Sequence, residues 1–84
     1  MIDRKLFPTK DFKLAAALMA SGKRLQDLRW KGTVAFFIFE DYSSCSDVAD
    51  SFTQNELVVK AWEFACAMNE LKMKLFAKRP MGDL

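Results

Sequence analysis

The chain has 84 residues, which leaves room for one small domain, residues 1–84, and not for a catalytic domain joined to a regulatory one. Hydrophobic residues make up 51% of the chain, which excludes an intrinsically disordered protein. The net charge of +2 is too small for a polybasic arm or an acidic mimic of nucleic acid, and the absence of His removes the commonest general base and metal ligand.

The first elements that the sequence predicts are a short strand and a helix. The chain is expected to run extended into Pro8, because the residue before a proline is kept out of the helical region. Over residues 11–21 apolar side chains recur at helical spacing. We expect Thr9 to cap this helix and Gly22 to end it.

A β-hairpin is predicted next, because residues 33–39 are rich in β-branched and aromatic side chains and follow a Lys-Gly pair. A two-residue loop at Lys31 and Gly32 makes Trp30 face Thr33. One face of the hairpin then contains Leu28, Trp30, Ala35, Phe37 and Phe39, and the other contains Val34, Phe36 and Ile38. Both faces of the second strand are apolar, so we expect each to be covered, by the protein's own helices or by another chain.

Two helices are predicted in the second half. Ser44 and Asp47 have the spacing of an N-terminal cap, which opens a short helix through Phe52. Thr53 and Glu56 form a second capping box, which opens a long helix of roughly 33 Å that ends near residue 78. Its apolar stripe steps alternately by four and three residues and contains Leu57, Ala61, Phe64, Met68, Leu71 and Leu75, broadened by Val58, Trp62, Ala65 and Phe76.

This order of elements predicts an α+β fold. A small antiparallel sheet, formed by the short N-terminal strand and the hairpin, packs with a short first helix, a short second helix and a long C-terminal helix. Residues 8–16, 37–41, 61–64 and 70–72 resemble a family of small prokaryotic and phage-borne proteins that is classified as a domain of unknown function. The resemblance implies a stand-alone domain of the kind found near mobile elements, and it brings no catalytic residues with it.

Charge is unevenly distributed along the chain. Residues 1–39 contain eight cations and three anions, whereas residues 40–56 contain five anions and no cation. Basic side chains beside an aromatic one on a hairpin are typical of small proteins that contact phosphates through a β-ribbon. The candidate contacts are Lys23, Arg24, Arg29, Trp30 and Lys31. The same cations also suit a solvated sheet edge, so a nucleic-acid interface requires them on one face with an exposed indole.

No constellation for catalysis is recognisable. The two thiols, Cys45 and Cys66, are 21 residues apart and form no CxxC motif, and two lone thiols suit a reducing cytoplasm. We therefore predict that the protein is not an enzyme and takes no cofactor and no metal. No segment has the apolar length of a membrane span, so a soluble, cytoplasmic chain is expected.

The sequence thus favours a small accessory or adaptor domain that binds an unidentified protein partner and forms a homodimer. The distal half of the last helix is expected to reach past the short sheet and to make the contact. The residues concerned are Met68, Leu71, Leu75 and Phe76. The alternative is a small nucleic-acid-binding protein that uses the basic hairpin. An apolar patch left exposed on a single protomer would favour the first hypothesis.

Overall fold

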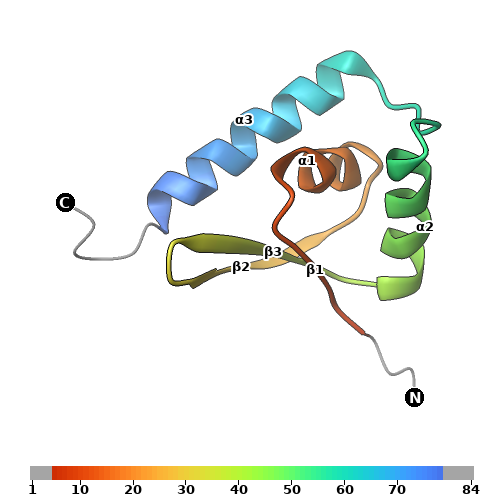
Figure 1. Ribbon diagram of the computed structural model, residues 1–84. Helices are drawn as coiled ribbons and strands as arrows, with labels where there is room; N and C mark the ends of the chain where they lie inside the picture. Colours follow the sequence, from red (N-terminus) through yellow and green to blue (C-terminus); the bar gives the residue numbers. More distant parts are fainter. Residues whose placement is uncertain (1–4, 79–84) are drawn as a thin grey trace.

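The computed structural model describes residues 5–78, in which three strands and three helices form an α+β fold, as predicted (Figure 1). In chain order the elements are β1 (Phe7–Thr9), α1 (Phe12–Ala20), β2 (Leu25–Lys31), β3 (Val34–Phe39), α2 (Tyr42–Thr53) and α3 (Ala61–Ala77). The three strands form one antiparallel sheet in the order β1-β3-β2, so the apolar strand β3 lies in the middle. Within the described residues no helix is both long enough and apolar enough to cross a membrane.

The hairpin forms at the predicted place but in a different register. Lys31 pairs with Val34 and Trp30 with Ala35, so the loop consists of Gly32 and Thr33, and the predicted pairing of Trp30 with Thr33 is wrong. Gly32 adopts a φ of 65°, a conformation that glycine reaches without the strain of a side chain, and this places it at the start of the loop. The register differs by two residues, which leaves every side chain on its predicted face.

The two faces of the sheet have different surroundings. Leu28, Phe37 and Phe39 are buried on the inner face, where the Phe12 ring meets Phe37 edge to face with 6.3 Å between ring centroids. The described helices lie above this face and beside the sheet, and none lies below it (Figure 1). Of the two ways of covering β3 that the sequence left open, the protein's own helices therefore serve only the inner face within residues 5–78, and coverage of the other face by another chain stays a prediction.

Helix α1 is the centre of the domain, and its ends follow from local sequence. The Asp11 carboxylate accepts hydrogen bonds from the backbone N–H groups of Lys13 and Leu14, at 3.0 and 3.2 Å, so Asp11 is the cap instead of Thr9. Gly22, at a φ of 91°, ends the helix as predicted. Three consecutive alanines between these ends are fully buried, because small side chains let the neighbouring elements approach closely; they are Ala15, Ala16 and Ala17.

Both later helices begin at residues other than those predicted. Asp41, and not Ser44, caps α2: its carboxylate accepts a hydrogen bond from the Ser44 N–H at 3.4 Å. Thr53 is the last residue of α2, so the predicted capping box does not open a helix. Asn55, at a φ of 60°, turns the chain out of α2, and the Glu56 N–H bonds back to the Ser51 carbonyl at 2.8 Å. Helix α3 begins only at Ala61 and is about 25 Å long.

Candidate functional site

Helix α3 packs on α1 through one of its sides. Leu71 has no exposed surface and Ala67 is 6% exposed, and both belong to the core that α1 and the sheet form. Phe64, Met68 and Leu75 are partly buried against the same core. We call these five residues the inner stripe. It accounts for the attachment of α3 to the rest of the domain.

A second stripe lies on the opposite side of α3, toward solvent. It steps by four, three, four and three residues and consists of Trp62, Cys66, Asn69, Met73 and Phe76. At 100° per residue these positions fall within a band of about 80°, roughly half a turn away from the inner stripe. Trp62 is 78%, Met73 64% and Phe76 70% exposed, and Cys66 and Asn69 are exposed as well. We call these five residues the outer stripe.

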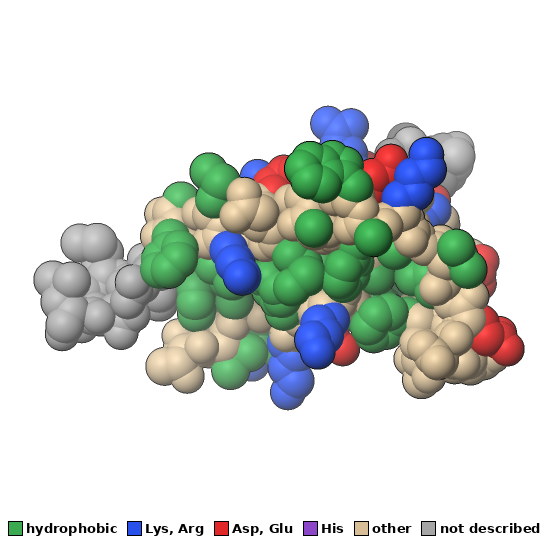
Figure 2. All heavy atoms as spheres, turned by 90° about the horizontal axis from the view of Figure 1, so that it is seen from above, with side chains coloured by type: hydrophobic (Ala, Val, Ile, Leu, Met, Phe, Trp, Pro, Cys, Tyr) green, Lys and Arg blue, Asp and Glu red, His purple; other side chains and the backbone are tan. Residues whose placement is uncertain are grey.

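The outer stripe contains most of the large apolar side chains that are strongly exposed within residues 5–78. Figure 2 views the molecule from above, the side on which α3 lies in Figure 1, and hydrophobic side chains extend across this face, with acidic groups mainly toward its edges. Among residues 5–78, three of the four most exposed large hydrophobic side chains belong to the outer stripe, and the fourth is Val58 in the loop before α3. Isolated exposed apolar residues are ordinary on a protein surface, whereas an aligned group of this kind is typical of an interaction site.

The interface residues predicted from the sequence do not form one surface. Leu71 is buried inside the domain, and Met68 and Leu75 pack against its core. Only Phe76 is largely exposed. The prediction placed the contact on the inner stripe because the long helix was expected to run past the sheet, whereas α1 covers that side of α3 (Figure 1). The missed residues are Trp62 and Met73, which the second run of four-and-three spacing indicates.

Charge is distributed unequally along α3. Its first ten residues, 61–70, contain Glu63 and Glu70 and no cation. The following residues, 71–78, contain Lys72, Lys74 and Lys78 and no acid. One ion pair lies within the helix, between Lys74 Nζ and Glu70 Oε2 at 3.9 Å. The outer stripe is therefore flanked by negative charge over its first half and positive charge over its second.

The residues proposed for nucleic-acid contact are dispersed around the hairpin. Lys23 donates a hydrogen bond to the Ser44 hydroxyl, Arg24 pairs with Glu40 at 3.9 Å, and Arg29 pairs with Asp27 at 3.0 Å. Arg29 and Lys31 alternate with Trp30 along β2 and so lie on the other face of the sheet. Trp30 is partly buried, and its Nε1 is covered and has no hydrogen-bond partner among the described residues. The nucleic-acid role stays a prediction, and its requirement of an exposed Trp30 is not met.

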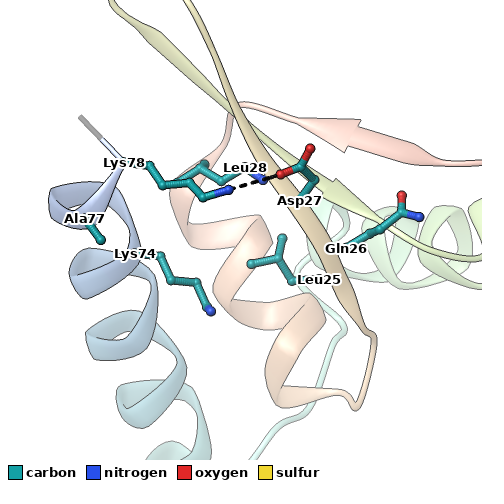
Figure 3. Close-up of a pocket in the computed structure, with 7 residues that line it drawn as sticks. All are labelled: Leu25, Gln26, Asp27, Leu28, Lys74, Ala77 and Lys78. Carbon is teal, nitrogen blue, oxygen red and sulfur yellow. Dashed lines mark hydrogen bonds and ion pairs between the residues drawn. The ribbon is translucent and has the colours of Figure 1, made fainter. Parts of the chain in front are cut away.

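A shallow pocket of about 260 Å³ lies between β2 and the C-terminal end of α3 (Figure 3). It is lined by Leu25, Gln26, Asp27, Leu28, Lys74, Ala77 and Lys78. Within it, Lys78 Nζ lies 3.3 Å from Asp27 Oδ1, and the Leu28 N–H donates to the same oxygen at 2.8 Å. The negative charge of the Asp27 carboxylate is thus balanced by ion pairs with Lys78 and Arg29. We assign this cluster the structural role of tying the end of α3 to the sheet.

The same contacts make the stability of the domain depend on pH. Hydrogen bonds from Arg29, from the Leu28 N–H and from Lys78 lower the pKa of Asp27 below its ordinary value. Because this pKa is lower in the folded state, the ionised carboxylate stabilises the domain at pH values above the ordinary carboxyl pKa of about 4. This contribution disappears as the pH falls through the lowered pKa.

Asp27→Asn should therefore reduce the melting temperature at pH 7, and the difference from the wild type should shrink as the pH falls below about 4. Asp47→Asn, at an exposed position of α2, is the matched control and should cause no such pH-dependent difference. Calorimetry at both pH values measures the effect. An equal deficit for Asp27→Asn at neutral and acid pH would contradict it.

The two thiols have different environments. Cys45 is fully buried, and its Sγ donates a hydrogen bond to the Glu40 carbonyl at 3.3 Å. Burial raises the pKa of this thiol, which keeps it protonated and unreactive. Cys66 is exposed within the outer stripe. Over residues 5–78 no group of three or more Cys, Asp or Glu side chains has the geometry to hold a metal ion.

Comparisons with protein-family models, with curated proteins and with solved structures found no match for this chain. The resemblance to a phage-borne family of unknown function therefore stays a prediction. The candidate site rests on the chemistry and placement of the outer stripe.

Proposed function

We propose that this domain is a non-enzymatic adaptor that binds protein through the outer stripe of α3. The supporting observation is the exposure of Trp62, Met73 and Phe76 on the side of α3 opposite the inner stripe. Aromatic residues and Met are enriched at the centres of protein interfaces, and a few aromatic anchors there supply most of the binding free energy. The location we propose is the cytoplasm, where an exposed thiol such as Cys66 stays reduced.

The rival apolar surface is the outer face of the sheet. It contains Val34, which is 40% exposed, and the partly exposed Phe36, whereas Ile38 beside them is buried. Three basic or acidic residues of β2 share this face, namely Asp27, Arg29 and Lys31. The outer stripe is the better candidate, because its large side chains are more exposed and are aligned along one side of a single helix.

Photo-crosslinking in the cells that naturally contain the chain tests the proposal. A photoreactive amino acid at position 73 should give covalent protein adducts, and the same amino acid at position 34 should give few. Both positions are exposed, so the substitutions are expected to leave the fold intact, and circular dichroism checks this. Adducts from position 34 and none from position 73, or no adducts from either, would contradict the proposed function.

A further inference from the structure

We infer that the partner of the outer stripe is a second copy of this chain, whose α3 lies antiparallel to the first about a two-fold axis near Asn69. This inference rests on the proposed function and names the partner for the same surface. It follows from the spacing of the stripe, from the charges beside it and from its exposed area.

The spacing of the outer stripe is nearly symmetric about Asn69. Trp62 lies seven residues before Asn69 and Phe76 seven residues after it, and Cys66 and Met73 lie three before and four after. Reversing the helix therefore places Trp62 of one copy against Phe76 of the other, and Cys66 near Met73. Each aromatic ring meets another aromatic ring, Met73 meets the smaller Cys66, and the only amide side chain of the stripe meets its own copy. A single polar residue within an apolar helix contact is a known determinant of register.

The charges beside the stripe favour the antiparallel direction. On a helical projection, Glu63 and Lys74 lie on the same flank of the outer stripe. They lie six residues before and five residues after Asn69, so an antiparallel pair brings Glu63 of one copy level with Lys74 of the other, to within about 1.5 Å along the axis. In a parallel two-fold pair this flank lies on opposite sides of the contact in the two copies, so Glu63 of one copy does not face Lys74 of the other. Glu70, which lies near the axis, has its own Lys74 at 3.9 Å.

The exposed area is sufficient for a dimer of moderate affinity. Trp62 is 78% and Phe76 70% exposed, so two copies offer roughly 600 Å² from these aromatic side chains alone. With Met73 and the flanking residues, the buried area is on the order of 1,000 Å², at the lower end of specific interfaces. Association is therefore expected in the micromolar range.

Light scattering at protein concentrations from about 5 to about 500 µM tests whether the chain forms the dimer. The mass should rise with concentration from that of one 9.6 kDa chain toward twice that value. Met73→Lys should raise the dissociation constant by at least about tenfold, because it places two charges in the contact. Val34→Lys, the matched change on the rival surface, should leave it unchanged. A wild type that stays monomeric throughout, or a dimer that only Val34→Lys dissociates, would overturn the inference.

A charge exchange tests the antiparallel direction. Glu63→Lys and Lys74→Glu should each raise the dissociation constant by about 3- to 10-fold, and the double variant should return it to within about twofold of the wild type. The two residues are about 16 Å apart along one helix, so such a rescue requires contact between copies. Single changes without effect, or effects that add in the double variant, would contradict the antiparallel arrangement.

Cys66 provides an independent check of direction. In the antiparallel pair the two Cys66 Cα atoms are offset by about 9 Å along the axis, beyond the roughly 7 Å that a disulfide can bridge. Mild oxidation should therefore leave the dimer non-covalent, and buried Cys45 cannot form a link instead. A dimer linked through Cys66 would show the parallel arrangement.

The outcomes separate this inference from the proposed function. If the chain is monomeric in solution and crosslinks in cells from position 73 only to a different protein, the inference of a second copy is wrong. The proposed adaptor function then still stands. Crosslinks from position 73 to the chain itself support both.

Discussion

Leu71→Lys is expected to unfold the domain, whereas Met73→Lys, two residues further along the same helix, should change the free energy of unfolding by less than about 1 kcal/mol. Leu71 has no exposed surface, so the substitution removes a buried side chain that contributes about 2 to 5 kcal/mol and places a charge among apolar groups. Met73 is 64% exposed and loses little. A domain of this size has a total stability of only roughly 5 to 15 kcal/mol.

Urea denaturation followed by circular dichroism measures both variants. Leu71→Ala should remain partly folded and should lose about 2 to 5 kcal/mol, which gives a value even where Leu71→Lys does not fold. Equal losses for Leu71→Lys and Met73→Lys would show that α3 does not have one buried side and one exposed side.

Phe37→Ala is expected to destabilise the domain by about 3 to 5 kcal/mol. Phe37 is 2% exposed on the inner face of β3, where its ring meets Phe12, so the substitution removes a buried ring and leaves a cavity in the core. Phe36→Ala is the matched control, because it removes the same atoms from the neighbouring position on the partly exposed outer face. Its cost should be less than half as large. Urea denaturation measures both losses of unfolding free energy. A larger loss for Phe36→Ala than for Phe37→Ala would mean that Phe36, and not Phe37, is on the buried face of β3.

The first half of the fold could be predicted from the sequence because its signals are local. A glycine that follows an apolar helix commonly ends that helix in a conformation with positive φ, and Gly22 does so in the structure. The faces of the hairpin follow from the alternation of side chains, which survives even a register error of two residues. The register itself depends on which of two adjacent positions starts the loop, and the placement of Gly32 decided this.

The boundary between α2 and α3 could not be predicted, because the same residues fit two structures. Thr53 and Glu56 have the spacing of a helix start, but Asn55 between them adopts the left-handed conformation that ends a helix. The capping pattern competes with this C-terminal signal, and the latter prevails. The predicted long helix therefore became α2, a loop and a shorter α3.

The predicted interface failed for a tertiary reason. The spacing of Met68, Leu71 and Leu75 correctly indicates an apolar stripe, but a periodic pattern does not say which element covers it. Helix α1 covers it, whereas Trp62 and Phe76, which were expected to broaden the same stripe, lie on the opposite side of α3. The basic hairpin failed to form one patch for a similar reason, since Asp27 and Glu40 pair with two of its cations.

Oxidative footprinting with hydroxyl radicals tests the central claim, that α3 uses its inner stripe for the fold and keeps its outer stripe for binding. In dilute protein Trp62 and Met73 should be oxidised much faster than Met68 of the inner stripe, relative to the intrinsic reactivity of each residue type. At high concentration Trp62 and Met73 should become protected, and Met68 should change little. Slow oxidation of Trp62 and Met73 in dilute protein, comparable to that of Met68, would contradict the account.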